Sequence, residues 1–163
     1  MLSEKMKELL NNQMASELYS SYLYLGLAYD FRTQGLPGFA HWFALQAQEE
    51  YRHALKIGDH ILMRDAIVIL QDLQAIVVKY ECPCEAMIAA LEHEQVISKQ
   101  IHDIMDEARE EHDYGTELLM SWFVKEQIEE EDTLKGIISQ LERLGDDQSG
   151  IIFMDKKLHE RPA

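Results

Sequence analysis

The sequence predicts an all-α protein: a bundle of four long helices, with a long crossover between the second and third and a short fifth helix at the C-terminus. Apolar residues recur at alternating steps of three and four over four long stretches, which places them on one face of each helix. The 163 residues include only three prolines, so these stretches can continue as long helices. At this length we expect one domain that spans residues 1–163.

The first helix is expected over about residues 3–32, with Ser3 as its N-cap. A short turn follows, and its Pro37 suits the first turn of a second helix over about residues 37–64. A connection this short makes the first two helices antiparallel neighbours.

The next segment, residues 65–82, contains two β-branched clusters, at 67–70 and 76–78, and lacks the periodic apolar stripe. A connection of this length can cross the whole bundle, which would make the third helix parallel to the second. Its apolar side chains favour burial in a subunit interface. A fifth helix within the bundle is the alternative.

Pro83 opens the third helix, expected over about residues 84–111, and the turn 113–116 leads into the fourth, over about 116–144. Gly145 is well placed to end that helix. A short amphipathic helix is expected over about residues 150–158.

Each of the four apolar stripes is interrupted near the middle of its helix by residues of the kinds that bind metals. They are Glu17 in the first helix, Glu50 and His53 in the second, Glu94 in the third, and Gln127 and Glu130 in the fourth. Helices packed in a bundle bring their midpoints to one level, so these groups should converge on one cavity. Four carboxylates and one imidazole suit two divalent first-row ions, with Glu50 able to bridge them. A hydrogen-bonded polar layer is the alternative.

Composition narrows the possible partners. Thirty acidic and fifteen basic residues give a net charge of −15, which disfavours nucleic acid and concentrates cations. No apolar run approaches the roughly 20 residues that span a bilayer, and the N-terminus lacks a signal-peptide core, so we expect a cytoplasmic protein without membrane contact. The two cysteines, Cys82 and Cys84, are expected to be free thiols without a function.

The sequence resembles those of the ferritins, most closely the non-haem ferritins of bacteria and archaea. The resemblance spans nearly the whole chain and rests on the motifs YSSYLYL (19–25), AQEEYRHA (47–54), WFVKEQIEEE (122–131) and FMDKKL (153–158). Ferritin-like di-iron bundles hold their metals with carboxylates and Glu-x-x-His pairs that project inward. The resemblance therefore implies a ferritin-like four-helix bundle that oxidises and stores iron.

The resemblance also implies roles for single residues. Glu17, Glu50 and His53 would hold one iron, and Glu50, Glu94 and Glu130 the other. Gln127 would be a hydrogen-bonding neighbour of this ferroxidase centre. Tyr24 would lie beside it, unless it is only a core aromatic residue. A third iron site would be formed by Glu49, Glu126, Glu129 and Glu130, for which an ordinary solvated acidic face is the alternative.

For the whole protein, the resemblance implies a homo-oligomeric shell of twenty-four subunits that takes Fe(II) and dioxygen or peroxide as substrates. Candidate pore residues are Glu110, Glu111 and Glu117. No haem is expected, because Tyr51 replaces the haem-binding methionine of bacterioferritins and the fourth helix carries Gln127-x-x-Glu130 in place of their Glu-x-x-His pair.

Three other functions are alternatives to this one. The main alternative is a rubrerythrin-like di-iron peroxidase or oxidase, which would favour a Cys-x-x-Cys module that this sequence lacks. A subunit that only stores iron would not need the intact ligand set. A metal-free structural bundle would leave the converging carboxylates unexplained.

Overall fold

The computed structural model describes residues 1–145 and 147–162, and within them it contains five helices and no strand. The helices are α1 (Glu4–Thr33), α2 (Pro37–Met63), α3 (Pro83–Glu110), α4 (Tyr114–Leu144) and α5 (Gln148–His159). The predicted fold class is thereby confirmed, and every helix end lies within two residues of its expected position.

Local sequence explains where the helices begin and end. The Ser3 hydroxyl accepts a hydrogen bond from the Met6 backbone N–H at 3.0 Å and so caps the start of α1. Prolines stand in the first turns of α2 and α3, where an N–H group is not needed. Gly145, with a φ of 52°, ends α4 in a conformation that favours glycine.

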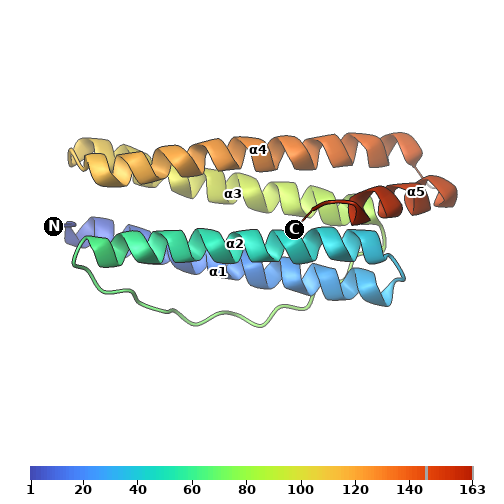
Figure 1. Cartoon of the computed structure of the whole chain (residues 1–163), viewed down its shortest axis with the longest axis horizontal. Helices are drawn as coiled ribbons and strands as arrows, with labels where there is room; N and C mark the ends of the chain where they lie inside the picture. Colours follow the sequence, from blue (N-terminus) through green and yellow to red (C-terminus); the bar gives the residue numbers. More distant parts are fainter. Residues whose placement is uncertain (146, 163) are drawn as a thin grey trace.

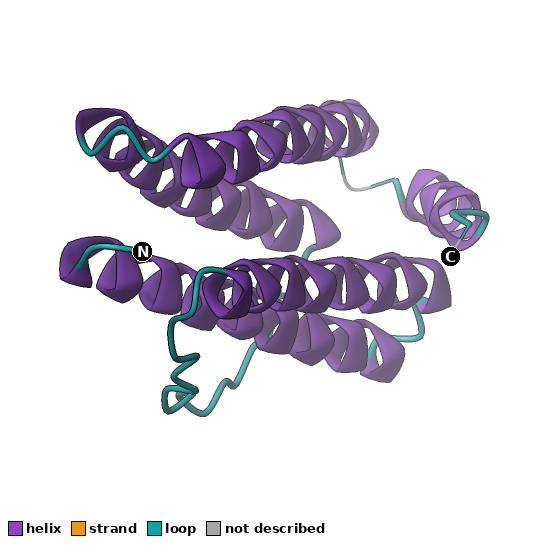
Figure 2. Ribbon diagram, turned by 60° about the vertical axis from the view of Figure 1, so that its left-hand side comes forward, coloured by secondary structure: helices purple, strands orange, loops and turns teal. Residues whose placement is uncertain are grey.

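The four long helices form two antiparallel hairpins, α1–α2 and α3–α4, which lie one above the other in Figure 1. Between α2 and α3 the chain returns along the full length of the bundle, so that α3 runs parallel to α2, as expected. Figure 2 shows that this crossover lies outside the α1–α2 hairpin, on the side away from α3 and α4.

The crossover has no regular structure over residues 66–80, so the alternative of a further bundle helix is wrong. Side chains of α1 bind its backbone instead. Asn11 accepts from the Ile69 N–H at 2.7 Å and donates to the Ile67 carbonyl at 3.2 Å. Towards the other end of the crossover, Asp30 accepts from the Tyr80 N–H at 3.1 Å.

The apolar core is divided into two clusters at opposite ends of the bundle. Along α1, one cluster includes residues up to Met14 and the other begins at Tyr24. The same division recurs in the other three helices, between Ala47 and Ala54, between Ala90 and Ile97, and between Phe123 and Leu134. The residues that interrupt the apolar stripes fall in the gap between the clusters, so a polar layer crosses the middle of the bundle.

Helix α5 folds back against the start of α2 (Figure 1). The buried Asp155 accepts hydrogen bonds from the backbone N–H groups of Gly38 at 2.7 Å and Phe39 at 2.9 Å. These are orphan donors in the first turn of α2. A Cβ on Gly38 would lie 1.6 Å from the Asp155 carbonyl oxygen, so this contact requires glycine. Among the described residues, no helix is long and apolar enough to cross a membrane.

Candidate metal centre

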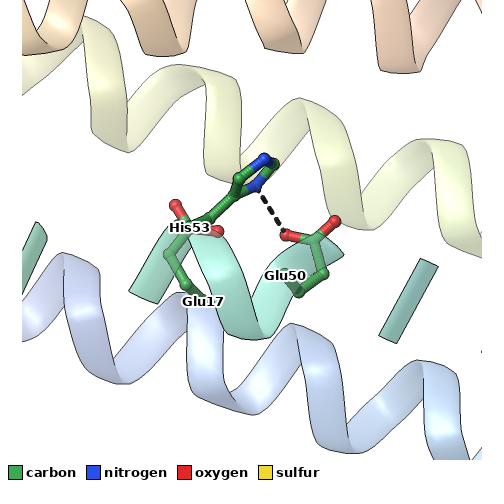
Figure 3. A group of neighbouring side chains, drawn as sticks. All are labelled: Glu17, Glu50 and His53. Atoms are coloured by element: carbon green, nitrogen blue, oxygen red, sulfur yellow. Dashed lines mark ion pairs between the residues drawn. The ribbon is translucent and has the colours of Figure 1, made fainter. Parts of the chain in front are cut away.

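Three of the predicted ligands meet between α1 and α2. Glu17 projects from α1, and Glu50 and His53 project from one face of α2 towards it, as Figure 3 shows. One potential ligand atom from each lies within 4.8 Å of the others, and all three side chains are buried. The His53 Nδ1 atom is 3.3 Å from Glu50 Oε2. This group has the size and composition of a site for one cation.

A second group joins the two hairpins. Glu50, Glu94 and Glu130 also present ligand atoms within 4.8 Å of one another, from α2, α3 and α4. Glu50 belongs to both groups and therefore lies where a bridging carboxylate would. His53 Nδ1 is 4.0 Å from Glu130 Oε1, which connects the groups further. All five predicted ligands thus converge on one place, as their register along the helices indicated.

Burial and mutual repulsion determine the electrostatics of this cluster. Burial, reinforced by the charge of Glu50, raises the pKa of Glu17 well above its usual range. Burial and then Glu94 raise the pKa of Glu50 to about 8. Burial, Glu50 and Glu94 together strongly raise the pKa of Glu130. Burial and mutual repulsion therefore favour the protonated form of these carboxyls, and a divalent cation would displace the protons.

Several atoms of the cluster face the centre without a partner. Glu17 Oε2, Glu50 Oε2, Glu130 Oε2 and His53 Nδ1 are buried and have no hydrogen-bond partner among the described residues. Buried polar atoms are rarely left unpaired in folded proteins. Three oxygens and one imidazole nitrogen are suitable ligands for a first-row divalent ion. The residues present therefore fit a metal site better than the alternative of a closed hydrogen-bonded layer.

The other oxygens of the carboxylates are oriented by neighbouring side chains. Gln13 donates to Glu17 Oε1 at 2.7 Å, and Gln46 donates to Glu50 Oε1 at 2.9 Å. Gln127 donates to Glu94 Oε2 at 2.9 Å. In Glu17 and Glu50 these bonds fix one oxygen and leave the other to bind a cation.

The roles of Gln13 and Gln46 were not predicted from the sequence, although a signal exists. Each lies four residues before the glutamate that it binds, one turn away on the same helix face. Gln127 is a hydrogen-bonding neighbour of Glu94, and its own Oε1 atom is buried without a hydrogen-bond partner among the described residues.

Tyr24 lies beside the centre. Its hydroxyl donates to Glu94 Oε1, and the ring packs against Phe43 with centroids 5.8 Å apart. Burial and the charge of Glu94 raise the pKa of Tyr24 well above its usual value, so the phenol keeps its proton. The side chain is at once a core aromatic residue and a hydrogen-bond donor to the predicted ligand.

The residues predicted for a third site line a cavity of about 140 Å³ next to the centre. Glu49, Glu126, Glu129 and Glu130 border it, together with Gln46 and Arg161. The Lys125 ammonium lies 3.4 Å from Glu129, and Arg161 forms an ion pair with Glu49. The sequence gave no indication that Arg161 would reach this cavity.

The candidate pore residues lie where α3 turns into α4, at the end of the bundle. Glu111 accepts from the Ser3 hydroxyl at 2.5 Å, and Glu117 pairs with Arg109 at 2.9 Å. Glu110 is exposed. At the opposite end of the bundle, Cys82 and Cys84 are free thiols, and burial raises the pKa of Cys84.

The chain is similar to known proteins along almost its whole length. The sequence model of the ferritin-like domain matches residues 7–144. A bacterial non-heme ferritin of Bacteroides fragilis is 37% identical over 99% of this chain and 100% of its own length. A probable bacterial non-heme ferritin-like protein of Haemophilus influenzae is 34% identical over 97% of this chain and 96% of its own. An open-pore ferritin from the hyperthermophilic archaeon Archaeoglobus fulgidus superposes with a TM-score of 0.98 at 38% identity, covering 99% of this chain and 100% of that one.

Proposed function

The chain belongs to the ferritin family, and from this premise we propose that it binds Fe(II) as a substrate, oxidises it to Fe(III) and stores the product inside a shell of like subunits. The observation that carries the proposal is the pair of ligand groups sharing Glu50. Two metal positions with a common carboxylate hold two ions close together, which is the arrangement that two-electron transfer to one oxidant requires.

In this proposal Glu17, Glu50 and His53 hold one Fe(II), and Glu50, Glu94 and Glu130 hold the other. Binding displaces the protons that burial keeps on Glu17, Glu50 and Glu130. Each Fe(II) then gives up one electron, and dioxygen or peroxide accepts the pair. Carboxylate oxygens are hard ligands and stabilise the product Fe(III) more than the substrate Fe(II).

Tyr24 and Gln127 act on Glu94 from two sides. Each donates a hydrogen bond to a different oxygen of this carboxylate. Such donors hold a ligand in the orientation that the metal needs. We therefore assign both residues to positioning Glu94 within the ferroxidase centre.

Storage follows from the acidic surface around the centre. Glu49, Glu126 and Glu129 would accept iron that leaves through Glu130, which borders both the centre and the neighbouring cavity. The net charge of −15 attracts cations, and Glu110, Glu111 and Glu117 are proposed to line an entry pore. A shell of twenty-four subunits in the cytoplasm is the proposed assembly.

The rubrerythrin-like alternative gains no support. The two cysteines flank a single proline and do not form a Cys-x-x-Cys module, and the relatives reported above are described as ferritins. The same relatives support a non-haem protein over a haem-binding one.

Aerobic addition of Fe(II) to the metal-free protein tests the ferroxidase proposal. Oxygen uptake and ferric absorbance are followed for the unmodified protein and for Glu50→Ala and His53→Ala. We expect each substitution to slow the initial oxidation about tenfold or more, because each removes a ligand. Glu92→Ala and His102→Ala, both exposed and outside the ligand groups, are matched controls that should keep the original rate. If the unmodified protein oxidises iron no faster than buffer does, the proposal is wrong.

A further inference from the structure

Arg161, which follows the end of α5, brings a positive charge to the acidic cavity beside the metal centre. The side chain of Arg161 lines the same cavity of about 140 Å³ as Glu49, Glu126, Glu129 and Glu130. After α5 the chain runs back along α2 (Figure 1). Arg161 is thus the one basic residue among nine that border this cavity.

Four contacts hold Arg161 in place. Its guanidinium forms an ion pair with Glu49 and donates to Gln46 Oε1 at 3.2 Å. The same group lies over the Trp42 ring, 5.0 Å from its centroid. The Arg161 backbone carbonyl is 3.0 Å from His41 Nε2. Arg161 thus contacts four side chains of α2, three through its guanidinium and one through its backbone carbonyl, so its position is fixed by the fold.

Arg161 is also connected to the di-iron centre through one intervening side chain. A guanidinium can only donate hydrogen bonds, so it requires the carbonyl oxygen of Gln46 to face it. The amide nitrogen of Gln46 is then directed to Glu50 Oε1, at 2.9 Å. Arg161 therefore selects the amide orientation in which Gln46 donates to the shared carboxylate.

We propose that Arg161 is a tethered counter-ion of the acidic cavity beside the centre, and that a third metal ion must displace its guanidinium from Glu49. The inference rests on the proposed function. A cation already paired with Glu49 competes with any metal that needs this carboxylate. Displacement would also release Gln46, so that the state of the cavity is communicated to Glu50. The third site therefore binds iron leaving the centre more weakly than it would without the Arg161 guanidinium.

Binding of Zn²⁺ to the assembled metal-free protein, measured by titration calorimetry, tests this inference without iron oxidation. We expect two tight sites per subunit and a weaker third. In Arg161→Gln the third site should become tighter by on the order of tenfold, while the two tight sites persist. Arg161→Lys keeps the charge but not the planar guanidinium, so its affinity at the third site should lie between those of the unmodified protein and Arg161→Gln. Lys156→Ala removes an exposed cation from the same terminal segment and should behave as the unmodified protein.

A double substitution tests whether the effect depends on Glu49. The increase in third-site affinity caused by Arg161→Gln should disappear in a Glu49→Gln background, because the carboxylate for which Arg161 and the metal compete is then absent. The inference is overturned if Arg161→Gln binds a third Zn²⁺ no more tightly than Lys156→Ala does, or if the gain persists without Glu49. Failure of the unmodified protein to bind two Zn²⁺ tightly would instead refute the proposed function, and this inference with it.

Discussion

At the scale of single residues, the centre combines groups that are unfavourable together until a cation arrives. Glu17 and Glu130 each present an oxygen within 4.8 Å of one from Glu50, and burial raises the pKa of all three carboxyls. Oxygens left without hydrogen bonds on all three carboxyls add to the cost. These groups therefore favour cation binding but lower the stability of the metal-free protein.

This arrangement predicts how the stability of the metal-free protein depends on pH. An unfolded glutamate titrates near 4.5, whereas these three buried carboxyls keep their protons to higher pH. Between about pH 5 and 8 the folded state therefore binds more protons than the unfolded state, and its free energy of unfolding falls as pH rises. Each carboxyl that keeps its proton lowers the free energy of unfolding by about 1.4 kcal/mol per pH unit, so we expect a loss on the order of 3 kcal/mol per such carboxyl from pH 6 to pH 8, measured by chemical denaturation.

Two controls identify the source of that pH dependence. Glu50→Gln removes one of the titrating groups and should flatten the profile. Saturating Zn²⁺ should flatten it as well, because the metal replaces the protons. An equally stable metal-free protein at both pH values would contradict the assigned pKa shifts.

A second prediction concerns Gln13, which orients Glu17 at 2.7 Å. Gln13→Ala removes the donor and leaves Glu17 free to rotate, so binding of the first Zn²⁺ should weaken about tenfold, as is typical for the loss of such a partner. Gln48→Ala, an exposed glutamine on α2, is the matched control in titration calorimetry. Unchanged affinity in Gln13→Ala would show that Glu17 is held by the bundle alone.

The convergence of the acidic residues could be predicted from the sequence, but their hydrogen-bond partners could not. Glu17, Glu50, Glu94 and Glu130 each break an apolar stripe, and the periodicity of one helix is enough to reveal them. Arg161 gives no such signal, because its contacts with Gln46 and Glu49 join residues more than a hundred positions apart. They depend on where α5 packs, which a local pattern does not specify.

At the scale of helices, the polar layer lies between two apolar clusters, and each long helix contributes to both. The clusters keep the helices in register on either side of the centre. Helix ends and lengths were predictable, since Ser3, Pro37 and Gly145 act locally. The irregular course of the crossover was not, because its backbone is held by distant side chains such as Asn11 and Asp30.

Docking of α5 provides a prediction at this scale. Asp155→Ala removes the acceptor of two buried N–H groups, those of Gly38 and Phe39. Each unsatisfied donor costs about 1–3 kcal/mol, so α5 should detach from α2 and become sensitive to proteolysis. Asp155→Asn keeps an acceptor oxygen and should be less affected. The exposed Asp132→Ala is the control, and equal protease resistance of Asp155→Ala and Asp132→Ala would count against this role.

At the scale of the whole molecule, the crossover exposes apolar side chains that a single subunit does not cover. Ile67, Leu70 and Val77 are 79%, 74% and 96% exposed. Exposed apolar surface of this kind is typical of contacts between subunits. The surface supports the proposed shell, in which the crossover would lie against a neighbouring subunit.

Leu70→Glu tests that contact. Placing a charge in an apolar interface should shift the assembled particle towards small species, visible as a lower mass by analytical ultracentrifugation. Gln74→Glu adds the same charge at an exposed position of the same segment and should leave the mass unchanged. A full-sized particle from Leu70→Glu would place the crossover outside the interface.

The division of the ligands between the two hairpins has a mechanical consequence. Glu17, Glu50 and His53 belong to α1–α2, whereas Glu94 and Glu130 belong to α3–α4. Any ion bound through Glu50 and either of the latter two fastens one hairpin to the other, and ligand binding to the folded state alone resists opening. Under the proposed function, iron at the centre fastens the two hairpins of each subunit together, so each subunit resists unfolding most while iron occupies its centre.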